Sequence, residues 1–156
     1  MKTEDGFSLV ELLIVVAIIA IIAAIAIPSL LTSKMASNEA AAMQGCRTVG
    51  SAEIAYAAVN NQRYTDITTL VSGNYLDSRF SGSGGFNGYT YTSGAVVGAA
   101  SSGTPPSFFG FLASPTTGGG RNTYGIATDQ LVRYQATVAG SSAPEGLVPG
   151  DPVGKN

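Results

Sequence analysis

The sequence predicts an α+β protein in which one long, kinked N-terminal helix packs on a small antiparallel β-meander. Three observations support this prediction. Residues 12–27 contain only Leu, Ile, Val and Ala, residues 33–59 are rich in Ala and lack Pro, and short β-prone runs separated by turn residues follow residue 88. Helical periodicity followed by several short strands is typical of an α+β arrangement. The 156 residues suffice for one domain of ordinary size.

The apolar segment comes first. With residues 7–10 before it and Leu30 and Leu31 after it, the segment reaches about 20 apolar residues, which at about 1.5 Å each can cross about 30 Å of hydrocarbon. We therefore expect a transmembrane helix here.

Glu11 is the one ionisable residue in this segment. A carboxylate at the centre of a spanning helix costs roughly 2.5–3.5 kcal/mol, and less near an end, so the surrounding Leu, Ile and Val still favour insertion. The segment contains no Lys, Arg or His, so we expect the partner of Glu11 to come from outside the helix. Cleavage between Gly6 and Phe7 would create a free α-amine four residues before Glu11, within reach from the same chain or from an identical neighbour.

Residues 6–16, GFSLVELLIVV, resemble the class III signal of type IV pilins and pseudopilins, and residues 17–31 continue the match. The resemblance implies that a prepilin peptidase cuts after Gly6 and N-methylates Phe7. It also implies that Glu11 guides assembly by pairing with the terminal amine of a neighbouring subunit. The short leader, the Gly-Phe junction, the position of the Glu and Pro28 together make this signal specific. The likeness is good to about residue 60 and holds only in outline beyond it.

This resemblance defines the expected organisation of the chain. Residues 1–6 would be the leader peptide, residues 7–31 the transmembrane and assembly helix, and residues 32–156 a periplasmic or extracellular globular pilin domain that includes the second half of the helix. The expected partners are the prepilin peptidase, the inner membrane, the pilus assembly machinery and further copies of the chain in a helical filament. The subunit would lie in the bacterial inner membrane before assembly and in a surface filament afterwards, or in the periplasm if it is a pseudopilin.

Pro28 removes a helical hydrogen bond and is expected to kink the helix; the resemblance adds unwinding in packed filaments as an alternative. Beyond Pro28 the helix should become amphipathic and end at Asn60 and Asn61. The face predicted to meet the sheet contains Met43, Cys46, Gly50, Ile54 and Ala57. Its small residues should let the sheet approach closely.

A short second helix is expected at residues 66–71, with Asp66 as its N-cap. Strands are expected at residues 89–92, 108–113, 123–127 and 131–136, forming a meander of three or four strands. Residues 81–88 should form a surface loop, which resembles a phosphate-binding loop only loosely because it lacks the Lys. The tail, residues 139–156, is expected to be irregular.

Composition narrows the chemistry. The chain has no His and a single Cys, and its net charge of −2 comes without a basic run. His-dependent catalysis, His-ligated metals, an intramolecular disulfide and a nucleic-acid footprint are therefore not expected. We predict no enzyme, no cofactor and no metal, and Cys46 should be a buried, inert thiol. Residues 151–154 faintly resemble a turn of calcium-binding pseudopilins, but too few carboxylates surround them to assign an ion.

The leading hypothesis is a structural subunit, major or minor, of a type IV pilus-like filament. A major pseudopilin of a type II secretion system would have the same N-terminal cleavage junction, Glu and apolar helix. Long surface filaments at native expression would distinguish the two. A membrane-anchored binding module is the alternative of another class. An uncut monomer that retains Met1 would favour it.

Overall fold

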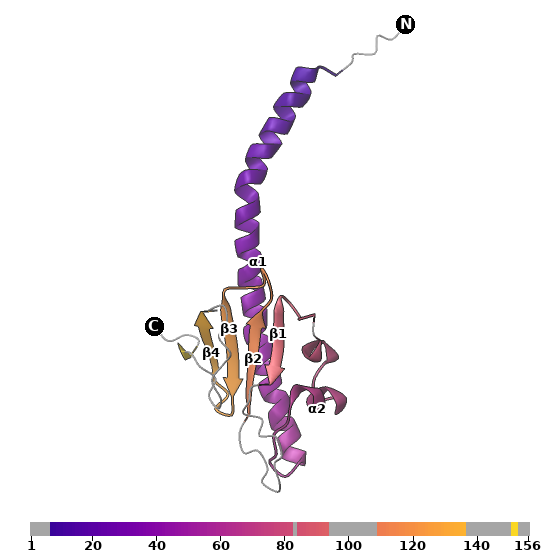
Figure 1. Cartoon of the computed structure of the whole chain (residues 1–156), viewed down its shortest axis with the longest axis vertical. Coiled ribbons are helices and arrows are strands. Elements are labelled where there is room, and N and C mark those ends of the chain that lie inside the picture. Colours follow the sequence, from indigo (N-terminus) through magenta and orange to yellow (C-terminus); the bar gives the residue numbers. More distant parts are fainter. Residues whose placement is uncertain (1–6, 83, 94–108, 137–150, 153–156) are drawn as a thin grey trace. The chain divides into compact units, whose positions relative to one another are not determined.

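A computed structural model of the chain describes residues 7–82, 84–93, 109–136 and 151–152 (Figure 1). The chain divides into two compact units, Met1–Lys34 and Met35–Asn156. Its elements, in chain order, are α1 (Leu9–Val59), α2 (Ile67–Ser72), the 3₁₀-helix η1 (Ser78–Ser81), β1 (Tyr89–Ser93), β2 (Gly110–Pro115), β3 (Asn122–Ala127), β4 (Val132–Ala136) and β5 (Asp151–Pro152).

The first half of α1 is a fully exposed helix within its own unit. None of residues 7–34 is buried. An apolar surface of this extent is expected to be exposed only where it contacts lipid or other copies of the chain. The helix continues through Pro28, and the hydroxyls of Thr32 and Ser33 donate to the carbonyls of Pro28 and Ser29 at 3.1 and 3.0 Å. The kink itself stays a prediction, as does unwinding in a filament.

The second half of α1 packs on the sheet of the globular unit. Its buried residues are Ala42, Gly45, Cys46, Val49, Gly50, Ala52, Glu53 and Ala57. The predicted face is confirmed at Cys46, Gly50 and Ala57, and Met43 packs partly buried against the core. The prediction was wrong for Ile54, which is 50% exposed. Glu53 occupies the core-facing position, and Ile54, one residue and about 100° further round the helix, turns outward.

Helix α1 ends at Val59, directly before Asn60 and Asn61, where the sequence predicted its end. The amide of Gln62 donates to the carbonyl of Ala57 at 2.9 Å, and Asn61 has a φ of 55°. This six-to-one hydrogen bond around a left-handed residue is a Schellman cap. The second helix is also confirmed, because the Asp66 side chain accepts a hydrogen bond from the Thr69 amide at 2.7 Å and caps α2.

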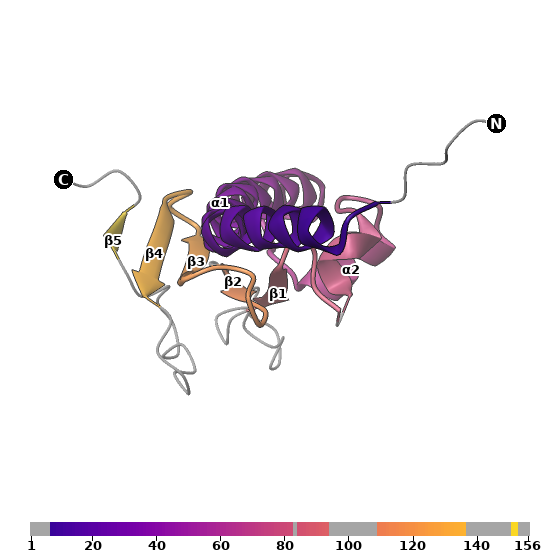
Figure 2. The same ribbon diagram turned by 90° about the horizontal axis from the view of Figure 1, so that it is seen from above.

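The sheet is a simple antiparallel meander with the order β1-β2-β3-β4-β5 (Figure 2). The predicted four strands are confirmed, with shifts of a few residues at their ends. Asp151 and Pro152 add a fifth strand, so the expectation of an irregular tail was wrong at these two residues; the rest of the tail lies outside the described residues. They pair with Tyr134 and Arg133 and cover the outer edge of β4, which would otherwise leave backbone groups unpaired.

Two glycines of α1 allow the close approach between helix and sheet that the sequence predicted. A Cβ atom at Gly45 would collide with the hydroxyl of Tyr91 on β1, and one at Gly50 would lie 2.7 Å from the Cδ1 of Ile126 on β3. The buried core on the sheet side is largely aromatic, with Tyr89, Phe109 and Phe111 almost fully buried. The absent side chain at Gly45 makes room for the ring of Tyr91, and the one at Gly50 makes room for Ile126.

The turn between β2 and β3 is tied to the same helix by two polar side chains. The Asn38 amide donates to the Gly119 carbonyl at 2.9 Å, and the Glu39 carboxylate accepts from the Arg121 amide at 2.7 Å. The glycines of this turn are required, because a Cβ at Gly119 would collide with the carbonyl of Gly88. The turn thus joins strand and helix segments that are far apart in the sequence.

Candidate processing and assembly site

The described chain begins at Phe7, and Phe7 and Ser8 precede the first residue of α1. Phe7 is 83% exposed. Gly6, the other residue of the predicted cleavage junction, lies outside the described residues. Phe7 is therefore an exposed residue ahead of the first turn of α1.

Glu11 lies in the first turn of α1 and accepts a hydrogen bond from the Ser8 amide, whose nitrogen is 3.0 Å from Oε2. The Ser8 carbonyl in turn accepts from the Leu12 amide at 3.2 Å. Ser8 therefore stands at the N-cap, and Glu11 reaches back to it as in a capping box. The positive end of the helix dipole also favours a carboxylate at this position.

This contact refines the expectation that the partner of Glu11 comes from outside the helix. Ser8, just before the first turn of α1, supplies a neutral donor from the same chain. Sequence reasoning missed Ser8 although the spacing Ser-x-x-Glu is a recognised signal for a helix start. The ion pairs in the described part of the chain join Asp77 to Arg79 and Asp129 to Arg133. Glu11 forms no ion pair with any described residue, so its hydrogen bond to Ser8 does not neutralise its charge.

The helix beyond Glu11 presents large apolar side chains to every side. Within the described residues, α1 is the one helix with a stretch long and apolar enough to cross a membrane, and that stretch is wholly exposed. Signal sequences near an N-terminus share this length and composition. The residues around the Gly6–Phe7 junction therefore carry the further evidence on membrane anchoring.

Residues 1–27 carry the prokaryotic N-terminal methylation motif. This motif is the class III signal peptide of type IV pilins and pseudopilins. No curated protein matches the chain. The motif supports a type IV pilin-like or pseudopilin precursor and indicates a structural subunit rather than an enzyme. Together with the apolar helix it fits membrane anchoring before assembly.

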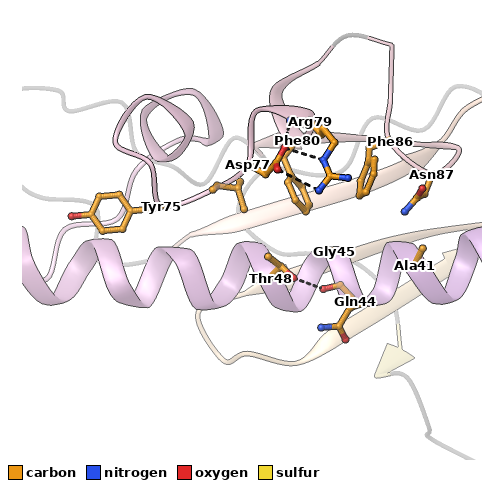
Figure 3. A pocket seen from close by; sticks show the side chains of 11 residues that line it. Ala41, Gln44, Gly45, Thr48, Tyr75, Asp77, Arg79, Phe80, Phe86 and Asn87 are labelled. Carbon is orange, nitrogen blue, oxygen red and sulfur yellow. Dashed lines mark hydrogen bonds and ion pairs between the residues drawn. The ribbon is translucent and has the colours of Figure 1, made fainter.

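A shallow cavity of about 350 Å³ lies between α1 and the segment that follows α2 (Figure 3). The side chains around it include Gln44, Thr48, Tyr75, Asp77, Arg79, Phe80, Phe86 and Asn87. Arg79 pairs with Asp77 at 3.0 Å and stacks over the Phe86 ring at 4.5 Å. This pairing lowers the pKa of Asp77 and raises that of Arg79. The two charges on the rim therefore satisfy one another.

The glycine-rich loop beside this cavity ends in a tight hairpin turn. Phe86 and Tyr89 exchange two backbone hydrogen bonds, of 2.6 and 3.0 Å, around Asn87 and Gly88. Both central residues have positive φ, 51° and 75°, as in the Asn-Gly turns that connect adjacent strands. The described part of this segment thus serves strand β1 as a turn, which fits the predicted surface loop better than a phosphate-binding loop.

Cys46 is buried on α1 as the sequence predicted, and burial raises the pKa of its thiol to about 12. A protonated thiol is a poor nucleophile and a poor metal ligand. Within the described ranges no group of three or more Cys, Asp or Glu side chains could hold a metal ion. Of the faint calcium-turn resemblance at residues 151–154, only Asp151 and Pro152 lie in the described chain.

Proposed function

We propose that this chain is the precursor of a structural subunit of a type IV pilus-like filament. A prepilin peptidase would cleave it between Gly6 and Phe7 and N-methylate Phe7, and the mature subunit would assemble through its N-terminal helix. The match of residues 1–27 to the methylation motif carries this proposal. The exposed apolar half of α1 supports it, because none of residues 7–34 is buried by the described part of the chain.

In this mechanism the membrane stores the subunits with residues 12–27 in lipid, and assembly transfers the same helices into the core of the filament. Lipid is about as apolar as Leu, so burial alone favours assembly only weakly. Close packing must contribute the rest, and a charged pair between Glu11 and a terminal amine would set the register of neighbouring subunits.

The Ser8 contact suggests how this pair could form. In the uncut chain the amide of Ser8 holds Glu11, and a hydrogen bond from a neutral amide to a carboxylate is worth about 1.5–3 kcal/mol. Cleavage would create a cationic amine at Phe7. A cationic donor makes a stronger hydrogen bond than a neutral amide, and a water-poor filament core screens the pair little. The amine of a neighbour could then bind Oε1 of Glu11, which accepts no hydrogen bond from the described residues, without breaking the cap.

The methylation motif is common to pilins and pseudopilins, so a major pseudopilin of a type II secretion system is the second candidate. Both would share the cleavage at Phe7 and the assembly role of Glu11. They differ in the product, because a pilin forms long surface filaments at native expression and a pseudopilin forms short periplasmic ones.

The test is electron microscopy of sheared surface material, with N-terminal sequencing and mass spectrometry of its main band. We expect filaments whose subunit begins at an N-methylated Phe7. A processed subunit without surface filaments would move the assignment to the pseudopilin. An uncut protein that retains Met1 and never forms filaments would overturn the proposal and favour a membrane-anchored binding module.

A further inference from the structure

Glu53 is the one charged side chain in the described part of the chain that is fully buried, with an exposure of 0%. It projects from α1 within the stripe of small residues that packs on the globular unit. A buried carboxyl group normally pairs with a cation or accepts several hydrogen bonds. Glu53 has neither among the described residues, and the assembly mechanism does not use it.

Its recorded partner is a single backbone group. The Thr65 amide nitrogen lies 3.2 Å from both carboxylate oxygens of Glu53. One N–H shared between two oxygens at this distance is a weak contact for a carboxylate, which can accept about four hydrogen bonds. The contact nonetheless spans twelve residues and fastens the end of the connection between α1 and α2, residues 60–66, to the body of α1.

The rest of this connection is fixed at both ends. The Schellman cap at Asn61 holds its start, and the Asn60 side chain donates to the Tyr56 carbonyl at 2.9 Å. At its far end, the amide of Ile67 donates to the Ser93 hydroxyl of β1 at 3.1 Å. Between these points the Glu53–Thr65 contact links residues 60–66 to the helix beneath them.

The titratable groups around Glu53 do not neutralise it. On α1, Tyr56 packs edge-on against Tyr75. In the connection, Arg63 is exposed, and Tyr64 packs against Phe109, the residue before β2. Asp66, which caps α2, adds a second negative charge near Glu53. The surroundings therefore favour the protonated carboxyl group.

The balance of these effects raises the pKa of Glu53 to about 7. Burial is the largest cause, the Thr65 hydrogen bond opposes it, and the charge of Asp66 adds to it. The carboxyl group can therefore change its charge near neutral pH while it remains inside the fold. Burial disfavours the ionised carboxylate more than the Thr65 hydrogen bond favours it, so ionisation favours a state in which water reaches the group. Because the Thr65 amide lies directly at the carboxyl group, local opening of residues 63–66 would admit that water.

We propose that Glu53 is a proton-controlled clasp on the α1–α2 connection, which holds residues 63–66 against α1 while its carboxyl group is protonated and releases them when it ionises. The proton dissociates to water, and no other group is required. The surface formed by this connection therefore depends on the pH around the globular unit. The proposal does not depend on assembly into a filament.

Amide hydrogen exchange of the full chain in detergent micelles, read by NMR between pH 5 and pH 8.5, tests the clasp. After correction for the intrinsic pH dependence of exchange, we expect the protection of the Thr65 amide to fall on the order of 100-fold over this range. Protection of β2 and β3 amides should stay nearly constant, because the opening is local. A Thr65 protection that does not change with pH would overturn the proposal.

The substitution Glu53→Gln keeps an oxygen acceptor for Thr65 and removes the charge, so its Thr65 protection should be independent of pH. Glu39→Gln is the matched control, because Glu39 also links α1 to a distant backbone amide, and it should retain the fall seen in the wild type. Equal falls in the wild type and in Glu53→Gln would refute the clasp. If Glu53→Gln fails to fold, the titration of the wild-type Glu53 carboxyl carbon can be followed by NMR. A titration midpoint near the ordinary value for Glu would refute the clasp, and one near pH 7 would support it.

Discussion

The amide nitrogen of Ser8 lies 3.0 Å from Oε2 of Glu11, so the only acid of the apolar segment is already hydrogen-bonded before any second subunit arrives. Two separate roles therefore coincide in one side chain: it caps its own helix, and it is proposed to pair with the amine of a neighbour. The first role needs an acceptor oxygen, and the second needs a negative charge. Substitutions can separate these roles.

Glu11→Gln retains the oxygen and removes the charge, whereas Glu11→Ala removes both. Both variants should insert into the membrane, because each makes the segment less polar. If the charged pair sets the register, both should lower the yield of sheared filaments by roughly tenfold or more, since that factor corresponds to only about 1.4 kcal/mol. Immunoblots of the membrane fraction measure insertion, and immunoblots of the sheared fraction measure filament assembly. Normal filaments from Glu11→Gln would show that assembly does not need the charge of Glu11, and that this residue only caps its own helix.

The sequence predicted the elements better than it predicted the polar contacts between them. Apolar runs, alanine content and turn residues predicted two helices and four strands, because these signals are local. The prediction was wrong at Ile54 because it followed hydrophobic spacing, whereas the buried position beside it is occupied by the acid Glu53. A pattern of hydrophobic residues cannot reveal a buried acid, whose partner Thr65 lies twelve residues away in a connecting segment.

The candidate site shows the same division. Phe7, Glu11 and the leader were predicted from the order of residues, and their roles stay predictions; the matched methylation motif spans all of them. The contacts of Asn38 and Glu39 with the turn between β2 and β3 could not be predicted in this way, because they join residues about eighty positions apart. Such contacts depend on how the helix and the sheet meet, which no local pattern specifies.

The stability of the globular unit should depend on pH through Glu53. The pKa of this carboxyl group rises from 4.5 to about 7 on folding, so the unfolded chain loses its proton first as pH increases. Stability from this group is therefore complete below about pH 4.5 and is lost as pH rises through about 7, at up to about 1.4 kcal/mol per pH unit. Urea unfolding of the full chain in micelles at pH 5 and pH 8 measures this loss, which Glu53→Gln should abolish and Glu39→Gln should retain.

The single thiol should react only after the protein unfolds. Cys46 is 1% exposed and its pKa is raised to about 12, so neither access nor thiolate is available to a reagent at pH 8. Mass spectrometry after iodoacetamide treatment should find Cys46 unmodified in the folded chain and fully modified in urea. Rapid labelling without denaturant would show that the contact between α1 and the sheet opens readily.

The contact between Gly45 and Tyr91 should limit what the middle of α1 tolerates. Ala is a better helix former than Gly by about 1 kcal/mol, yet a Cβ at Gly45 would collide with the Tyr91 hydroxyl. Overpacking of this kind typically costs about 1–3 kcal/mol, so Gly45→Ala should destabilise the globular unit in urea unfolding.

Tyr91→Phe supplies the test of that explanation. The Tyr91 hydroxyl is buried and has no hydrogen-bond partner among the described residues, so removing it should be neutral or stabilising and should restore most of the stability lost in Gly45→Ala. Tyr89→Phe is the contrasting control, because the Tyr89 hydroxyl donates to the Asn122 carbonyl at 2.8 Å and its loss should cost about 1 kcal/mol. If the double variant is as unstable as Gly45→Ala alone, the hydroxyl is not what excludes a side chain at position 45.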